Sequence, residues 1–457
     1  MNMTRMSIIL LLLLCFVPPS LVFADGFRNP FHDSAAMGQG NAFRAQADNP
    51  SAVFYNPAGL TQLSGIQHSF GVQFISPNTT YRSTTGQKVE NDIDGGTVGF
   101  PPPGQFFLTA NLADTEIDFL ERFSVGFGLL NLFGFANEYP KDGPFAGAIT
   151  RGQLPLIALK PTIGMKLTDS VSIGVGADIF TFASFLGEGH QEQQSIALGN
   201  IPGTTAGDEL ELNGKGTTTG LNASLLVTLL RHENDHPMVN LGFIWRSQAV
   251  LPLKGELLAN GTFVANAKTS LRFPESYELA LAIWPLRNGE REWKVEVDVD
   301  LVRWSSIRNF DVSLSNGATI PNPQQWSDAM TLYAGTEYRL LGTTDHPDWD
   351  YAFRIGGNRS ESPIPDKNFN PAFADAVVYG FATGVGFFCD GEGQFLWIVN
   401  CQSDEPGFLS RKGMGIDLLY FGLRFNERRV SGHAFPAVNG RYKTVTHSGG
   451  FTFRVIF

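Results

Sequence analysis

The sequence predicts an all-β chain that folds as a transmembrane antiparallel β-barrel of about 14 strands, with an N-terminal hatch (plug) inside the lumen. Three observations support this prediction. Segments of about ten residues alternate apolar and polar side chains from residue 66 to the end of the chain, which is typical of membrane barrels. The composition is apolar and poor in charge. An irregular stretch rich in glycine and proline precedes the first alternating segment.

The composition fits a wall that faces lipid. Hydrophobic residues make up 43% of the chain and aromatic residues 12%, with 38 Phe against 10 Tyr. Charged residues make up 17%, below the roughly 25% of an ordinary soluble protein. The 50 glycines suit strands that kink or coil. A net charge of −11 without a basic stripe argues against a nucleic-acid partner.

Residues 1–24 have the features of a secretory signal peptide. They contain one basic residue, Arg5, an apolar run over residues 8–17 and a small-residue ending at 22–24. A lipoprotein signal is excluded because Cys15 lies within the leucine run, and a retained membrane anchor is the alternative. The rest of the chain has no stretch of 18 apolar residues, so no membrane-spanning helix is predicted.

Residues 25–65 form the predicted hatch. The stretch shows no alternation, so it is not a strand, and short helical turns fit only near residues 34–37 and 49–55. It is broken by Pro30, Pro50 and Pro57. A compact irregular segment ahead of a long all-β body indicates a plug inside a barrel.

Residues 66–457 form the predicted barrel. The clearest strand is 293–301, in which Trp293, Val295, Val297, Val299 and Leu301 alternate with Lys294, Glu296, Asp298 and Asp300. The other segments lie at 66–74, 105–112, 123–129, 157–167, 171–179, 221–229, 239–245, 277–283, 330–338, 351–355, 376–388, 412–427 and 441–457. The resulting even number of strands is typical of bacterial barrels.

The connections alternate in length. Short ones at 169–170, 232–236 and 287–291 predict periplasmic turns, and long ones at 79–102, 187–213, 257–268 and 361–375 predict external loops. The last segment ends on Phe457, as expected for the closing strand that barrel-assembly machinery reads. A soluble β-sandwich also alternates, but it does not predict some 400 residues without a domain break, nor tryptophans near strand ends (Trp245, Trp284 and Trp293).

Two cysteines remain once the signal peptide is removed. Cys389 and Cys401 flank a loop-like stretch, and secretion implies an oxidising compartment. We therefore expect a disulfide between them; a metal site is the weaker alternative, because no His or Cys cluster accompanies the pair. The strand count places this loop on the periplasmic side, where it is an insertion.

Three parts of the hatch carry a recognisable pattern: Gly26-Phe27-Arg28, the run 34–41 and the run 48–60, whose core is Asn56-Pro57-Ala58. In this order, after a signal peptide and before an alternating barrel, they resemble the hatch of the FadL family of outer-membrane transporters of long-chain fatty acids and other hydrophobic compounds. The similarity extends along the chain to Gly126, Gly128, Phe133-Gly134, 303–305 and 362–366. The cysteine-containing insertion departs from the family pattern.

Candidate site residues follow from the hatch and from the resemblance. Asn56, Pro57 and Ala58 are candidate gating residues, because Pro57 lacks an N–H and Asn56 can bond neighbouring backbone. The alternative is a purely structural turn that holds the hatch in place. Apolar hatch side chains are the candidate substrate-binding residues: Phe27, Phe31, Met37, Phe43, Phe54 and Tyr55. A lateral opening is expected at a kink in the third strand, at Gly126, Gly128 and Gly134.

The resemblance implies passive uptake of long-chain fatty acids or other hydrophobic compounds across the bacterial outer membrane, with lateral release into the bilayer. A lumen of this size admits a solute, and the apolar side chains of the hatch suit an apolar ligand. The expected partners are the hydrophobic solute, outer-membrane lipid and lipopolysaccharide, and the barrel-assembly machinery, which would read the C-terminal strand. We expect a monomer, without cofactor or metal, that uses no energy source beyond the solute gradient.

Two other functions are compatible with a barrel. A non-specific porin or adhesin-like barrel is one alternative, and an outer-membrane acyl hydrolase or transferase is the other. An enzyme needs a nucleophile and base in contact, and His32-Asp33-Ser34 are adjacent residues that cannot form a triad. His68 lies on the predicted lipid face. The sequence therefore does not predict an enzyme.

Overall fold

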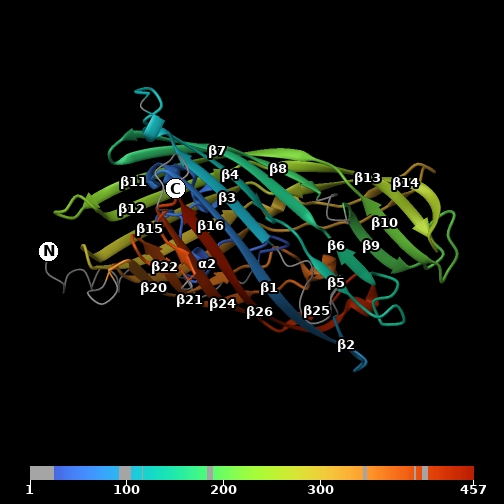
Figure 1. Ribbon diagram of the computed structural model, residues 1–457. Coiled ribbons are helices and arrows are strands. Elements are labelled where there is room, and N and C mark those ends of the chain that lie inside the picture. Colours follow the sequence, from blue (N-terminus) through green and yellow to red (C-terminus); the bar gives the residue numbers. More distant parts are fainter. Residues whose placement is uncertain are drawn as a thin grey trace.

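The computed structural model describes residues 25–91, 104–115, 117–182, 189–342, 347–395, 398–403 and 410–457. The predicted signal peptide, residues 1–24, lies outside these described residues. Figure 1 shows an elongated molecule whose long tilted strands surround the N-terminal segment, while a second group of strands extends from one end.

Fourteen antiparallel strands form the barrel wall, which confirms the predicted fold and strand count. Each strand pairs with the next one in the ring, and the first strand pairs with the last from Gln67↔Ile456 to Ser83↔Gly440, which closes the barrel. The strands are β1 (Ile66–Ser83), β3 (Gly104–Asn111), β4 (Phe123–Leu130), β7 (Leu156–Thr168), β8 (Val171–Phe182), β11 (Thr218–Arg231), β12 (Pro237–Arg246), β15 (Ser276–Arg287), β16 (Arg291–Val302), β19 (Ala329–Leu340), β20 (Trp349–Ser360), β21 (Val378–Asp390), β24 (Gly413–Phe425) and β26 (Gly440–Ile456). Two short strands, β2 (Lys88–Glu90) and β25 (Arg428–Val430), extend the sheet beside β1 and β26.

The alternation along each strand separates a lumen face from a lipid face. On β16 the charged residues Lys294, Glu296, Asp298 and Asp300 are almost completely buried in the lumen. Val297, between them, is 44% exposed on the outside. This is the pattern of a membrane barrel, in which the outer side chains meet lipid and the inner ones meet water or a plug.

One of the three tryptophans near strand ends faces the lumen and not the outside of the barrel. Trp284 lies near the end of β15, as predicted, but its side chain is buried and packs with Ala45 of the hatch. Side chains alternate along a strand, and Trp284 is six residues after Glu278 on β15. Both side chains therefore point into the lumen. Trp293, by contrast, is exposed on the outside of β16.

A second sheet extends from one end of the barrel (Figure 1). Its eight strands are, in spatial order, β18 (Thr319–Ile320), β17 (Val312–Leu314), β14 (Thr262–Phe273), β13 (Ala249–Ala259), β10 (Glu209–Gly214), β9 (Gln191–Ile196), β6 (Arg151–Gln153) and β5 (Ala136–Glu138). Two predicted external loops, 187–213 and 257–268, are therefore wrong as loops and contain strands of this sheet. The hairpin between β13 and β14 turns at Asn260-Gly261, both with positive φ (49° and 74°), as a tight hairpin turn requires.

In the part of the chain that the structure describes, the helices are all short. The hatch contains α2 (Ser34–Met37), α3 (Ala52–Tyr55) and the 3-10 helix η1 (Pro57–Gln62). Connections contain η2 (Leu112–Thr115), η4 (Trp304–Ser306), η5 (Asp366–Asn368), η6 (Pro371–Phe373) and η7 (Pro436–Val438). Within the described ranges, no helix has both the length and the apolar character needed to cross a membrane.

The short turns lie at the end of the barrel where β1 begins, and we take this end as periplasmic. The predicted disulfide is confirmed here: Cys389, at the end of β21, is bonded to Cys401. Between them a small hairpin, β22 (Gln394–Phe395) and β23 (Val399–Asn400), folds back over the outer wall. Phe395 packs against Phe453 of the last strand, with ring centroids 5.7 Å apart.

Candidate functional site

Residues 25–65, the hatch, lie inside the ring of strands. Helix α2 contacts β21, β24 and β26, whereas α3 and η1 contact β4, β7, β8 and β11. Most hatch side chains are buried. The hatch therefore touches the wall on several sides, and the character of its contacts differs from one side to another.

The Asn56-Pro57-Ala58 motif ties the hatch to β11. The Asn56 Oδ1 accepts a hydrogen bond from the amide of Ala58 (3.1 Å). The Asn56 Nδ2 donates to the backbone carbonyls of Arg44 (2.8 Å) and Leu225 (3.3 Å). The Ala58 amide also donates to Oγ of Ser224 (2.9 Å). Asn56 is fully buried, so its amide group satisfies backbone groups that no water can reach.

Pro57 begins η1, where its missing N–H leaves no partner unsatisfied. Its backbone lies against Gly174 of β8, where any Cβ would overlap Pro57 and Ala58. The glycine on the wall and the proline in the hatch therefore fit as a pair.

One side of the lumen holds the hatch backbone with carboxylates of β16. The amide of Phe43 donates to Oδ2 of Asp298 (3.1 Å), and the amide of Ala45 donates to Oε1 of Glu296 (2.7 Å). Lys294 on the same strand donates from Nζ to the carbonyl of Ala42 (3.0 Å). Three successive lumen-facing side chains of β16 thus fasten four consecutive hatch residues.

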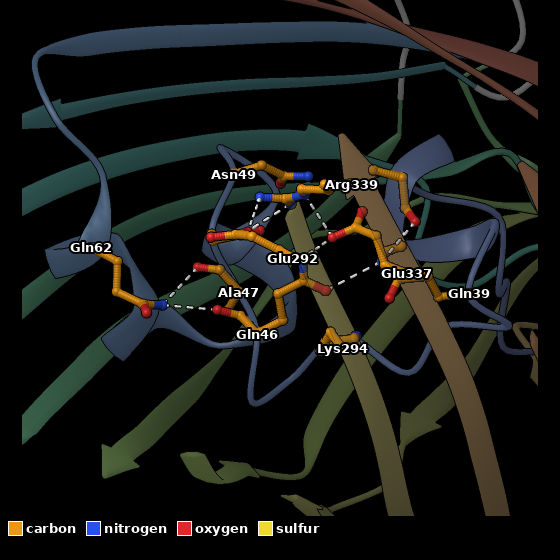
Figure 2. A network of polar contacts seen from close by, with 12 residues as sticks. Gln39, Gln46, Ala47, Asn49, Gln62, Glu292, Lys294, Glu337 and Arg339 are labelled. Atoms are coloured by element: carbon orange, nitrogen blue, oxygen red, sulfur yellow. Dashed lines mark hydrogen bonds and ion pairs between the residues drawn. The ribbon is translucent and has the colours of Figure 1, made fainter. Parts of the chain in front are cut away.

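Ion pairs reinforce this side. Arg44 of the hatch pairs with Glu278 of β15 and with Asp298, which lies 3.2 Å from its Nη1. Figure 2 shows the neighbouring contacts, in which Arg339 of β19 bonds Asp48 (3.0 Å) and Glu337 (2.8 Å). Glu337 in turn accepts a hydrogen bond from Gln46 (2.7 Å). We call the set Lys294, Glu296, Asp298, Glu278, Glu337 and Arg339 the polar anchor.

The side of the lumen formed by β4 and β7 makes apolar contacts instead. Val53 of α3 packs on Gly126 and Gly128, and Leu60 of η1 packs on Gly126 and Gly164. A Cβ at Gly126 would lie 2.6 Å from a Val53 methyl group, which real side chains do not tolerate. The glycines predicted as a kink therefore admit close approach of the hatch to the wall.

The N-terminal end of the hatch adds a short β-bridge beside the chain that follows β4. The amide of Asn29 donates to the carbonyl of Leu132 (2.9 Å), and the amide of Gly134 donates to that of Phe27 (3.1 Å). Arg28 and Phe133 are the bridged pair. Arg28 also pairs with Asp300 of β16. The first hatch residues thus span the lumen from the β4 side to the polar anchor side.

A cavity of about 60 Å³ lies between this N-terminal end, the hatch and the wall. This volume is far below the roughly 300–1,000 Å³ of a small-molecule site, so in this structure the cavity is too small for a long-chain ligand. Rings and aliphatic side chains form its apolar lining: Phe54, Tyr55, Leu132, Phe133, Phe180 and Phe273.

Charged groups form the other part of the lining. Three guanidinium groups and three carboxylates line the cavity: Arg28, Arg44, Arg246, Asp25, Asp178 and Glu278. Burial raises the pKa of Asp25 to about 6, although Arg28 beside it lowers the value. At neutral to mildly acidic pH, Asp25 is therefore partly protonated and the charge balance of the lining shifts toward positive.

Two nitrogen atoms in this lining have no hydrogen-bond partner in the described part of the chain: Nη1 of Arg246 and Nδ1 of His32. Oδ2 of Asp178 lies 3.9 Å from Arg246 Nη1, which is too far for a hydrogen bond. Burial, together with the nearby cations Arg246, Arg28 and Lys160, lowers the pKa of His32 to about 3. His32 is therefore neutral and can donate one hydrogen bond.

The predicted apolar hatch residues separate into three groups. Phe54 and Tyr55 line the cavity. Phe27 packs in a cluster with Trp304 and Trp326, and Phe43 packs on Tyr55. Phe31 and Met37 belong to a separate cluster against β21 and β24. Gly134 lies at the N-terminal bridge, away from Gly126 and Gly128 in sequence and in contacts.

The sequence interpretation missed the charged residues around the cavity. Arg44 and Arg246 carried no motif, and Arg28 was recognised only as part of the Gly26-Phe27-Arg28 pattern and not as a site residue. The available signal was the alternation itself, because it put Asp178, Glu278 and Lys160 on the lumen face, where a buried charge requires a partner. In the described residues, no group of three or more His, Cys, Asp and Glu is arranged to hold a metal ion.

Comparisons with known proteins agree with this architecture. Residues 18–394 match the family described as outer membrane protein transport protein (OMPP1/FadL/TodX). The chain is 22% identical over 398 residues to the long-chain fatty acid transport protein of Salmonella typhi, covering 80% of this chain and 84% of that protein. It is 21% identical over 409 residues to the protein of the same name in Escherichia coli K12, with the same coverage.

Solved structures share the fold. A FadL homologue from Pseudomonas aeruginosa superposes with a TM-score of 0.72 at 18% identity, covering 95% of this chain and all (100%) of that one. The Ralstonia pickettii toluene transporter TbuX gives a TM-score of 0.60 at 14% identity, covering 93% and 98%. These relatives are transporters and not enzymes. The chain thus belongs to the OMPP1/FadL/TodX family of transport proteins of the bacterial outer membrane.

Proposed function

We propose that this chain takes up long-chain fatty acids passively across the outer membrane and releases them sideways into the bilayer. The observation that carries the proposal is the small cavity between hatch and wall, with aromatic rings on one part of its surface and unsatisfied donors on another. Such a surface suits a molecule with an alkyl chain and one anionic group. Relatives named as long-chain fatty acid transport proteins support this class of substrate over aromatic hydrocarbons.

The donors Arg246 Nη1 and His32 Nδ1 are the proposed carboxylate site. The guanidinium of Arg246 is already held in place, because its Nε bonds Glu278 (2.9 Å) and its Nη2 bonds the carbonyl of Phe54 (2.6 Å). Only Nη1 is left for a ligand. Hydrogen bonds to charged groups contribute roughly 1.5–3 kcal/mol, so loss of this one should weaken fatty acid binding by about 10- to 100-fold.

The proposed exit is the gap that the N-terminal bridge fills beside β4. Strands β3 and β4 have 8 residues each, compared with 18 in β1 and 13 in β7. Beyond Leu130 the chain bonds Phe27 and Asn29 of the hatch. Movement of residues 27–29 would enlarge the cavity and expose the wall there, while the polar anchor keeps the rest of the hatch in place.

The carboxylate site is tested with Arg246→Ala, measuring binding of a labelled fatty acid and of its methyl ester. We expect a loss of about 10- to 100-fold for the acid and little change for the ester. The matched control is Arg339→Ala, which likewise removes an arginine contact to the hatch, here the ion pair with Asp48, but lies outside the cavity lining. An equal loss for acid and ester would show that Arg246 only holds the hatch.

The exit is tested by closing it. Arg28 and Phe133 are bridge partners, and opposite residues of a β pair are close enough for a disulfide. We expect Arg28→Cys/Phe133→Cys, in a background lacking Cys389 and Cys401, to stop fatty acid uptake until a reductant is added. Uptake that is unchanged by oxidation in cells with equal surface levels would rule out this exit. It would leave the carboxylate site untouched.

A further inference from the structure

A row of cations crosses four neighbouring strands at the external end of the barrel. In the register of the sheet, Lys88 of β2 lies opposite Arg82 of β1, Arg82 lies opposite Arg441 of β26, and Arg441 lies opposite Arg429 of β25. All four side chains are exposed, and Arg429 is the most exposed of those in ion pairs, at 71%. Figure 1 shows these four strands together at the end from which the second sheet extends.

Two more cations continue the row toward the membrane on the same outward face. Lys443 lies two residues from Arg441 and opposite Thr80. Arg424 of β24 lies opposite Val445, and both cations are exposed. We call these six residues the seam cluster, because it flanks the pairing of the first and last strands: Arg82, Lys88, Arg424, Arg429, Arg441 and Lys443.

The seam cluster has few counter-charges of its own. Glu90 lies 2.5 Å from Lys88, and Glu427 lies 3.7 Å from Arg429 and 4.0 Å from Arg441. Within the described part of the chain, Arg82, Arg424 and Lys443 form no ion pair. Like charges directly opposite each other destabilise a sheet, and this arrangement occurs in a chain whose net charge is −11. An external anion would relieve the repulsion.

The height of the seam cluster restricts the kind of anion. The outward apolar band ends at the row Phe74–Gly449–Tyr420, after which the outward residues are mostly polar. Arg424 lies four residues beyond that row, Lys443 six and Arg441 eight. At about 3.3 Å per residue and a tilt of about 45°, these positions lie roughly 9, 14 and 19 Å above it.

Phospholipid headgroups do not reach that far. The headgroup region adds only about 5–8 Å on each side of the hydrocarbon core. The outer leaflet of a bacterial outer membrane also contains lipopolysaccharide, whose phosphorylated sugars extend beyond the headgroup plane. We propose that the seam cluster binds the phosphorylated core oligosaccharide of lipopolysaccharide, with successive cations at successive heights. This inference is independent of the transported substrate.

The test uses the purified full-length barrel in detergent with a chelator, so that divalent cations cannot bridge the lipid phosphates. The variant is Arg82→Ala/Arg441→Ala/Lys443→Ala. Its control, Arg122→Ala/Lys166→Ala/Arg291→Ala, removes the same charge from exposed residues at the periplasmic end. Binding of core-phosphorylated lipopolysaccharide is measured by native mass spectrometry, beside phosphatase-treated lipopolysaccharide and phosphatidylglycerol.

We expect the seam variant to bind phosphorylated lipopolysaccharide at least 10-fold more weakly than the unmodified chain and the control variant. Phosphatase treatment should weaken binding to the unmodified chain to a similar degree, and added salt should do the same, because exposed charges are screened. Phosphatidylglycerol should bind all three proteins equally. Heat-modifiable gel mobility verifies that each variant is folded, and Arg82→Lys/Arg441→Lys should retain binding.

Two results would overturn the proposal. The first is equal lipopolysaccharide affinity in the seam variant and the unmodified chain. The second is a loss of phosphatidylglycerol binding as large as the loss of lipopolysaccharide binding, which would indicate general attraction of anionic lipid to a basic surface.

Discussion

At the scale of single residues, Val297 and Asp298 of β16 are neighbours in sequence but face different surroundings. Val297 is 44% exposed on the lipid side, near the middle of its strand, whereas Asp298 is completely buried against the hatch. Val297→Arg would place a charge in hydrocarbon, which destabilises a barrel by roughly 2–4 kcal/mol near the midplane. Urea unfolding of the barrel in lipid vesicles measures this free energy.

Asp298→Asn is the matched comparison. It removes a charge that accepts hydrogen bonds from the Phe43 amide and from Arg44 but leaves the strand pairing intact. We expect the free energy of barrel unfolding to fall by less than about 1 kcal/mol. Proteolysis of the hatch should become faster. Equal destabilisation by the two substitutions would mean that the faces of β16 are assigned wrongly.

Asp375 lies in the loop after β20 and makes the docking of this loop depend on pH. Burial raises the pKa of Asp375 to about 8, and Ser362 donates a hydrogen bond to its carboxyl (2.6 Å). A raised carboxyl pKa means that the docked loop retains a proton that the undocked loop has lost. Docking is therefore strongest at low pH and weakens as the pH rises from about 4 to about 8.

Hydrogen exchange of residues 361–377, corrected for the intrinsic rate, measures this loss of protection. Asp375→Asn should remove the pH dependence, because the amide does not titrate. Asp366→Asn, a partly exposed carboxylate of the same loop, should leave it in place. A flat profile in the unmodified chain would contradict the assignment.

Residue identity alone predicted part of the site. Asn56 was recognised from its motif, and its bonds to the backbone follow from a short amide next to a proline. Phe54 and Tyr55 were found as apolar hatch residues, but the same criterion also selected Phe31 and Met37, which pack elsewhere. Periodicity cannot distinguish these cases, because the hatch has no regular face and only tertiary packing decides which rings meet the cavity.

At the scale of elements, the disulfide hairpin lies on the outside of the wall. It packs on Met414 and Val455, which would otherwise meet lipid or the membrane surface. We expect Cys389→Ser/Cys401→Ser to leave barrel unfolding almost unchanged, because the β-ladder holds the fold. Cleavage near residues 394–400 by a protease should become much faster. Mass spectrometry of the unreduced protein that finds two free thiols would contradict the bond itself.

The barrel strands were predictable as elements because membrane strands must alternate over their full length. The second sheet was not. Residues 257–268 were predicted as an external loop, yet β13 and β14 run through them as a paired hairpin. Outside the membrane, alternation is weaker evidence, and the partners β10 and β17 come from distant parts of the chain. Sequence patterns do not reveal that pairing.

At the scale of the whole molecule, the barrel and the hatch depend on each other unequally. The strands close on themselves through β1 and β26, so the wall needs no hatch to satisfy its backbone groups. Deletion of residues 25–59 should therefore leave a folded barrel with an open lumen. We expect small sugars to leak through it, whereas binding of a hydrophobic ligand is lost.

The experiment compares uptake of labelled fatty acid, toluene and a sugar by cells with equal surface levels of each protein. Asn56→Ala/Pro57→Gly is the milder variant and should lower fatty acid uptake more than it raises sugar leakage. Undiminished uptake of fatty acid and toluene by the deletion variant would show that the hatch only blocks the lumen and takes no part in uptake. This result would contradict the proposed mechanism.

The unequal attachment of the hatch also has a consequence for its dynamics. On the β16 side, directional bonds to Asp298, Glu296 and Lys294 must break together before the chain can move. On the β4 side, Val53 only rests on glycines, and non-directional contacts allow sliding. The hatch should thus be stiff along one wall and compliant along the other. Amide exchange of Phe43 and Ala45 should be among the slowest in the hatch, and that of α3 should be faster.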